Sequence, residues 1–132
     1  MKVICTANRG KALPLVYFAL GDTPESEFNL SIGRTYYAFA IALWQSCLHL
    51  LIFDDSKRPR WNPIELFSIS DPHLPDEWFF ATYTDHPCGV SALWGYETLI
   101  VDPNHYERLT EQEPDAVAIF EEERRKRGVQ YE

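Results

Sequence analysis

The segment from Thr35 to Trp44 constrains the fold more than any other part of the sequence. It reads Thr-Tyr-Tyr-Ala-Phe-Ala-Ile-Ala-Leu-Trp, so larger side chains alternate with alanine. A period of two places successive side chains on opposite faces of a β-strand. The larger residues then share one face, namely Tyr37, Phe39, Ile41 and Leu43. The opposite face carries Tyr36, Ala38, Ala40 and Ala42, and its alanines indicate that another element packs closely there.

The residues around this segment predict further short strands joined by turns. A tight connection at residues 45–47 leads into Leu48–Phe53, which we expect to pair with the first strand as a hairpin. Other strands are expected where short apolar or aromatic runs lie between turn residues, at 2–6, 65–69 and 78–84. Residues 94–101 are expected to form a last strand or an extended arm. Residues 13–20 fit either a strand or a helix.

The end of the chain predicts two helices. Asp102 can cap the first, with Pro103 at its first helical position and with Tyr106 and Leu109 on its buried side. The second is expected to start at Pro114 and to end at Gly128, a residue suited to the position after a helix. Its apolar stripe would comprise Val117, Phe120 and the stem of Arg124. Each of Glu121, Glu122 and Glu123 precedes a basic residue by four positions.

This order of elements, with strands first and helices last, predicts an α+β fold with a mainly antiparallel sheet. A chain of 132 residues fits a single domain, 1–132, which is strand-rich over 1–101 and helical over 102–128. Hydrophobic residues make up 45% of it and aromatic residues 14%, enough for a core without disulfides or metals.

The location of the protein is predicted from its cysteines and its apolar runs. Three widely spaced cysteines, Cys5, Cys47 and Cys88, do not form a disulfide framework. The first ten residues lack the apolar run of a signal peptide. The apolar stretch 36–53 is interrupted by Gln45, Ser46 and His49, which argues against a membrane span. We therefore expect a cytoplasmic protein that does not interact with a membrane.

The charge is distributed unevenly along the chain. The net charge is −8, and residues 61–123 contain 14 acidic residues but only one base, Arg108. Nucleic-acid binding requires the opposite sign, so this half of the chain is not expected to bind nucleic acid. An acidic surface would instead steer a cationic partner toward it. Solubility alone is another explanation for the acidic composition.

The centre of the chain carries a pattern of turns and aromatic residues. Gly33-Arg34-Thr35-Tyr36-Tyr37 opens a strand, and Leu51-Ile52-Phe53-Asp54-Asp55 closes the next. Trp61-Asn62-Pro63 and Glu65-Leu66-Phe67 follow. The run from Gly33 to Phe80 resembles SH3-like barrel segments of small bacterial proteins, including immunity proteins encoded beside polymorphic toxins. The resemblance implies a partly closed SH3-like β-barrel or meander, and it transfers no catalytic residue to this chain. No cofactor is expected.

Charge and resemblance together predict a non-enzymatic binding protein. In its narrower form this is an immunity or antitoxin protein that masks a cationic bacterial toxin by stoichiometric occlusion. The acidic residues expected to pair with the partner are Asp71, Asp76, Glu77, Asp85 and Glu97. Trp78, Trp94 and Tyr96 are expected to supply aromatic anchors, because Trp and Tyr dominate interface hot spots. An equally good explanation of the tryptophans is that they fill the ends of a small barrel.

Two other functions fit the sequence. A small hydrolase or nucleotide-processing enzyme would use the carboxylates Asp54, Asp55, Glu65 and Asp71, or Cys88 with His86 as its base. Turn chemistry also explains Asp54-Asp55, and His86 with Cys88 provides too few ligands for a zinc site. A regulatory module would use residues 121–127 of the last helix as its contact. The basic loop 57–60 suits a phosphate, an acidic peptide or a solvated hairpin tip.

Overall fold

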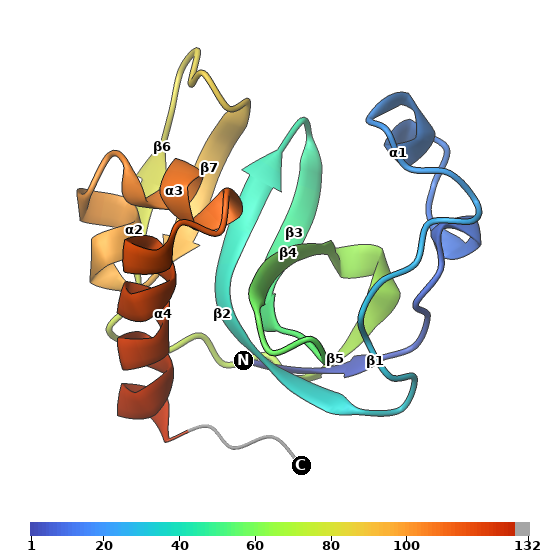
Figure 1. Ribbon diagram of the computed structural model, residues 1–132, viewed down its shortest axis with the longest axis horizontal. Coiled ribbons are helices and arrows are strands. Elements are labelled where there is room, and N and C mark those ends of the chain that lie inside the picture. Colours follow the sequence, from blue (N-terminus) through green and yellow to red (C-terminus); the bar gives the residue numbers. More distant parts are fainter. Residues whose placement is uncertain (129–132) are drawn as a thin grey trace.

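The computed structural model describes residues 1–128, and Figure 1 shows how their strands and helices are arranged. A single sheet contains the seven strands β1 (Lys2–Cys5), β2 (Thr35–Trp44), β3 (Cys47–Phe53), β4 (Pro59–Pro63), β5 (Phe67–Asp71), β6 (Phe79–Thr82) and β7 (Val90–Gly95). The α-helices are α1 (Val16–Ala19), α2 (Glu97–Val101), α3 (His105–Thr110) and α4 (Pro114–Arg127). Two short 3₁₀ helices complete the chain, η1 (Gly10–Ala12) and η2 (Ile64–Leu66).

The sheet is antiparallel and is organised around the long strand β2. Its main path runs β4-β3-β2-β1-β5, and β7 pairs with β2 and with β6. The first residues of β2, Thr35–Tyr37, pair with β1, whereas Ala40–Trp44 pair with β7. One edge of β2 therefore serves two strands in succession, while β3 occupies the other edge. The α+β class and the antiparallel sheet are as predicted.

The predicted hairpin between β2 and β3 is confirmed, and its turn explains the tight connection. Gln45 and Ser46 form the turn, with φ values of 50° and 63°. Two-residue hairpin turns with positive φ at both positions match the twist of the flanking strands. The turn sets the register that places His49 opposite Ala42.

The predicted division of β2 into two faces is wrong beyond its middle. In the pairing with β3, Ala38 lies opposite Ile52 and Ile41 lies opposite Leu50. The two residues Phe39 and Ala40 therefore oppose the single residue Leu51. An extra residue of this kind is a β-bulge, and it moves all later side chains to the other face. Phe39 therefore shares a core with Ala40 and Ala42, and Ile41 packs on the other side.

The sheet has a buried core on each of its faces. One lies between β2, β3, β7 and the helices α2–α4, and includes Phe39, Leu51, Leu93, Leu109 and Phe120. The other lies inside β1–β3 and β5 with the long segment before β2, and includes Val3, Tyr17, Tyr36, Leu50 and Leu66. In Figure 1 the helices α2, α3 and α4 lie on one side of β2, and α1 lies on the opposite side of the molecule. Strand β3 is almost continuously apolar because both of its faces are buried.

Close packing against the alanines of β2 is confirmed at Ala40. Gly95 of β7 lies opposite it, and a Cβ on Gly95 would come within 2.8 Å of the Ala40 Cβ atom. The same added atom would lie 2.9 Å from Leu99 in α2. The alanine and the glycine thus allow α2 to sit directly on the sheet.

Two predicted elements differ from those observed, and one observed strand was not predicted. Residues 94–101 divide between the end of β7 and helix α2, because Gly95 ends the strand and Leu99 then turns onto the sheet. Residues 65–69 divide between η2 and β5. Strand β4 was not predicted; residues 57–60 were expected to form a basic loop, and β4 has a proline at each end, Pro59 and Pro63. Because β4 lies at the edge of the sheet, it tolerates these prolines.

The C-terminal helices follow the sequence signals closely. Helix α3 begins at His105 rather than Pro103, and the Asp102 carboxylate accepts a hydrogen bond from the main-chain N–H of Asn104. Helix α4 begins at Pro114 and ends before Gly128, which has the left-handed φ of 63°. Its ion pairs join residues three apart, such as Glu121 with Arg124, rather than four apart. No helix within residues 1–128 combines the length and apolar character needed to span a bilayer.

Candidate functional site

The eight residues predicted to bind a partner do not form one surface. Glu77, Tyr96 and Glu97 lie around a shallow hollow beside α4. Two bases of α4, Lys126 and Arg127, line the same hollow, and Arg127 forms an ion pair with Glu77. This region is therefore of mixed charge rather than acidic.

Tyr96 is buried, which contradicts its prediction as a surface anchor. Only 2% of it is exposed, and its hydroxyl lies 2.6 Å from Nε2 of His105. Burial raises the pKa of Tyr96 well above its usual range. The residue lies between β7 and α2, where the turn of the chain directs its ring into the core.

The two predicted tryptophan anchors are half-buried. Trp94 lies on β7 and contacts Phe80, with 4.8 Å between ring centroids, and Trp78 lies in the loop before β6. The most exposed aromatic residues of this region are Phe79 and Phe80, at 44% and 54%. Phe80 thus covers part of the ring that was expected to face a partner.

The remaining predicted acids lie apart from one another. Asp71 ends β5, where hydrogen bonds from the side chain and main chain of His73 lower its pKa. Asp76 is exposed in the loop between β5 and β6, and Asp85 is exposed in the loop between β6 and β7. These positions do not converge on one site.

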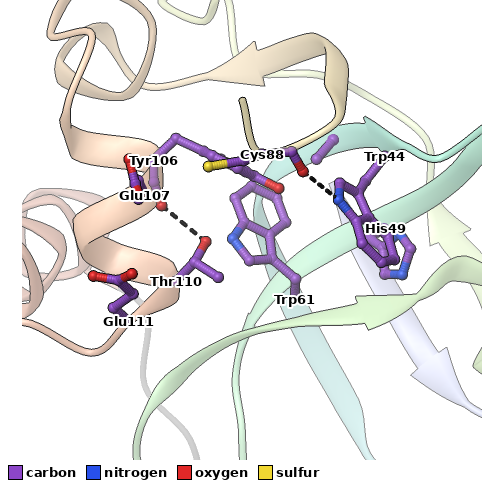
Figure 2. Close-up of a pocket in the computed structure, with 9 residues that line it drawn as sticks. Trp44, His49, Trp61, Cys88, Tyr106, Glu107, Thr110 and Glu111 are labelled. Carbon is purple, nitrogen blue, oxygen red and sulfur yellow. Dashed lines mark hydrogen bonds between the residues drawn. The ribbon is translucent and has the colours of Figure 1, made fainter. Parts of the chain in front are cut away.

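A different set of residues surrounds a cavity with aromatic walls. Its volume is about 380 Å³, within the range of small-molecule pockets. We name it the Trp44–Trp61 cavity, and its lining residues are Ala42, Trp44, His49, Trp61, Cys88, Tyr106, Glu107, Thr110 and Glu111. Figure 2 shows Trp61 between the α3 residues on one side and Trp44 with His49 on the other.

The strand register brings the sheet residues of this cavity together. Ala42 and Trp44 are two residues apart on β2 and share a face. His49 of β3 pairs with Ala42, and Trp61 of β4 pairs with Leu51, two residues beyond His49. Alternate residues of neighbouring strands lie on one side of the sheet, so the strand register places these side chains near one another. The His49 ring also contacts Tyr17, with 5.8 Å between ring centroids.

Helix α3 and the residue directly after it, Glu111, provide the opposite wall. Tyr106 and Thr110 are four residues apart, as are Glu107 and Glu111, so the four lie on adjoining strips of one helix side. The Thr110 hydroxyl donates a hydrogen bond of 2.8 Å to the Tyr106 main-chain oxygen. Tyr106 contacts Trp61, with 5.5 Å between ring centroids, and this contact joins the helix to β4.

The β6–β7 loop closes one side of the cavity. The indole N–H of Trp44 donates to the Cys88 main-chain oxygen at 2.6 Å. The next residue, Gly89, has a φ of 82°, and a Cβ there would lie 3.3 Å from the Trp44 indole nitrogen. Glycine therefore allows the loop to approach Trp44. The indole N–H of Trp61, in contrast, is buried without a hydrogen-bond partner within residues 1–128.

Electrostatically, the cavity has neutral walls and an acidic margin. Burial lowers the pKa of His49, and burial raises the pKa of Tyr106 to about 12, so both are uncharged at neutral pH. Burial, together with Glu107 and Glu111, raises the pKa of the Cys88 thiol. No Lys or Arg lines the cavity. Within the described part of the chain, neither glutamate forms an ion pair.

The groups considered for catalysis have other contacts. The ring Nδ1 of His86 accepts a hydrogen bond of 3.0 Å from the main-chain N–H of Cys88, and the raised pKa of Cys88 keeps its thiol protonated. Asp54 accepts hydrogen bonds from Ser56 and pairs with Arg60, as expected for turn chemistry. Over residues 1–128 no three His, Cys, Asp or Glu side chains are grouped as metal ligands.

The other two carboxylates are also engaged. Asp55 accepts hydrogen bonds from Ser31, Arg34 and Tyr36. Glu65 accepts one of 2.7 Å from the Tyr17 hydroxyl. The contacts of both acids therefore connect the long segment before β2 to the sheet.

The chain matches no protein-family model, no curated protein and no solved structure. The chemistry open to the Trp44–Trp61 cavity therefore follows from its own residues. Flat aromatic walls attract organic cations, and carboxylates at the margin add charge complementarity.

Sequence reasoning missed this site because its parts are distant in sequence. Trp44, Trp61 and Tyr106 come from β2, β4 and α3. The strand β4 that carries Trp61 was itself not predicted. One signal was present: Glu107 and Glu111, spaced by one helical turn beside Tyr106, marked an acidic strip next to an aromatic residue.

Proposed function

We propose that this chain is a non-enzymatic protein that binds a basic protein partner. The observation that carries the proposal is the Trp44–Trp61 cavity, whose aromatic walls adjoin Glu107 and Glu111, two acids that form no ion pair within residues 1–128. In its narrower form, the proposal is a bacterial immunity protein that neutralises a cationic toxin by stoichiometric occlusion. The partner surface is then on α3 and β4, and not on the loops around residues 71–78.

The narrower form also rests on the proposed SH3-like character of β1–β5. The order β4-β3-β2-β1-β5 and the 3₁₀ helix η2 between β4 and β5 support that arrangement. The main-chain N–H of Thr6 donates a hydrogen bond of 2.8 Å to the oxygen of Leu66, which ties the end of β1 to η2. A cytoplasmic location belongs to the same proposal and is supported by three free cysteines.

In the proposed mechanism, the charged residues and the aromatic surface have different roles. Two exposed acids, Glu107 in α3 and Glu111 directly after it, increase the rate at which a basic partner is encountered. The aromatic walls then bury apolar area and slow dissociation. Binding covers the partner's functional surface without changing it chemically.

The test is neutralisation of the protein encoded by the neighbouring gene. That protein is expressed in bacteria with and without this chain, and growth is measured. Growth inhibition by the neighbour and its reversal by the chain are the expected results. The double variant Glu107→Gln/Glu111→Gln should lose protection. The matched control Asp76→Asn/Glu97→Gln changes the net charge equally, at two exposed acids away from the cavity, and should keep it.

Two results would overturn the proposal. In the first, the neighbouring protein is not toxic and forms no complex with this chain. In the second, the chain protects, but the control variant abolishes protection and the Glu107→Gln/Glu111→Gln variant does not. The second result would move the partner surface back to the region predicted from the sequence.

A further inference from the structure

The walls of the Trp44–Trp61 cavity limit what can occupy it. Trp44, Trp61 and Tyr106 provide three aromatic side chains, and Ala42 provides a small one. An anion would find no Lys or Arg on the lining and two glutamates at its margin. A purely apolar group would leave those carboxylates unused. The lining therefore selects for a cation with an apolar or flat body.

The hydrogen-bonding groups of the cavity discriminate between kinds of cation. The Cys88 main-chain oxygen already accepts from Trp44, and the Tyr106 main-chain oxygen accepts from Thr110. A compact ammonium would lose much of its hydration among these walls and regain few acceptors. A guanidinium is more weakly hydrated, stacks its flat face on aromatic rings, and can donate from its edge to carboxylates.

We propose that the Trp44–Trp61 cavity receives an arginine side chain of the protein partner. The guanidinium stacks on the indole walls, and its N–H groups donate to the carboxylates of Glu107 and Glu111. This inference rests on the proposed function and names the anchor that the partner supplies. Arginine is a frequent hot-spot residue, and here its pocket is built from three strands, a loop and a helix.

The test uses capped tripeptides, acetyl-Gly-Xaa-Gly-amide, with arginine, citrulline or lysine at the central position. Citrulline has nearly the shape of arginine but no charge. Binding to the full chain is followed by the indole N–H resonances of its four tryptophans. Two of these, Trp44 and Trp61, line the cavity, whereas Trp78 and Trp94 lie outside it and serve as internal controls.

With the arginine peptide, saturable shifts are expected at Trp44 and Trp61 and not at Trp78 or Trp94. The citrulline and lysine peptides should each bind about tenfold more weakly or not measurably. Glu107→Gln/Glu111→Gln should weaken arginine binding, and Asp76→Asn/Glu97→Gln should not. Both variants change exposed side chains, so the fold should be kept.

Equal binding of the arginine and citrulline peptides, or the absence of shifts at Trp44 and Trp61, would overturn the inference. Stronger binding of lysine than of arginine would also overturn it. The proposed function is tested separately by neutralisation of the neighbouring protein. Protection without arginine binding would remove only the arginine anchor. Arginine binding without protection or a complex would remove the proposed function instead.

Discussion

The indole nitrogen of Trp44 donates a hydrogen bond of 2.6 Å to the main-chain oxygen of Cys88, 44 positions later in the chain. This bond joins the end of β2 to the loop between β6 and β7. Trp61 lines the same cavity, but its buried indole N–H has no partner within residues 1–128. Two tryptophans of one site are thus held by different means, one by a hydrogen bond and the other by packing alone.

Replacing each of these tryptophans by phenylalanine should separate the two contributions. Both changes remove similar volume, but only Trp44→Phe leaves the Cys88 oxygen without its donor. We expect Trp44→Phe to lower the free energy of unfolding by about 1 kcal/mol more than Trp61→Phe does. Urea denaturation of the two variants measures this difference. Equal losses would show that the Trp44–Cys88 bond adds nothing to stability.

Gly95→Ala tests the close contact between β7, β2 and α2. The added methyl would lie within 2.8 Å of the Ala40 Cβ atom and 2.9 Å of Leu99. Overpacking of this kind costs about 1–3 kcal/mol, and thermal unfolding should detect it. A variant as stable as the natural chain would mean that α2 does not sit directly on Ala40.

Phe120→Ala tests whether α4 belongs to the core. The Phe120 ring is fully buried, with ring centroids of Phe39 and Phe53 at 5.0 and 6.2 Å. Its removal should cost about 3–5 kcal/mol in the free energy of unfolding, measured by urea denaturation. Truncation after Gln112 should unfold the domain for the same reason. A truncated chain that stays folded would favour a role for α4 as a detachable binding helix.

The stability of the domain should fall below neutral pH. Burial lowers the pKa of His49 and His105 below the ordinary value of 6.5, so the unfolded chain takes up protons first. The contribution of these histidines to the free energy of unfolding is then fully present above about pH 6.5. It decreases as the pH falls toward the lower pKa of the folded state. Urea midpoints measured between pH 7 and pH 5 test this expectation.

A pair of histidine variants provides the control for that pH dependence. His49→Phe removes one buried histidine and should reduce the slope of stability against pH. His73→Gln changes a side chain that is 92% exposed, so it should change the free energy of unfolding at pH 7 by less than about 0.5 kcal/mol. An unchanged slope in His49→Phe would show that His49 does not contribute to it.

The sequence predicted those parts of the fold that depend on local patterns. The β2–β3 hairpin followed from alternation and a short connection, and α4 followed from Pro114 and Gly128 at its ends. The bulge at Phe39–Ala40 could not be predicted, because it depends on pairing with β3. Residues 97–101 became a helix because Leu99 packs on Gly95 and Ala40, a tertiary contact that local propensity does not contain.

The candidate site was harder to predict than the fold. The expected partner residues were chosen by local charge and aromatic content, but Arg127 neutralises Glu77 and the core buries Tyr96. Both outcomes depend on α4 and α3 packing back onto the sheet. The acidic and aromatic character expected of a partner surface instead occurs together at Tyr106, Glu107 and Glu111, opposite Trp61.

The central claim is that α3 and the Trp44–Trp61 cavity bind a basic protein. Isothermal titration of the purified neighbouring protein with this chain tests it most directly. We expect a one-to-one complex, which Glu107→Gln/Glu111→Gln weakens by about tenfold or more, or about 1.4 kcal/mol. The charge-matched Asp76→Asn/Glu97→Gln variant should bind like the natural chain. The claim is contradicted if no complex forms, or if only the second variant loses affinity.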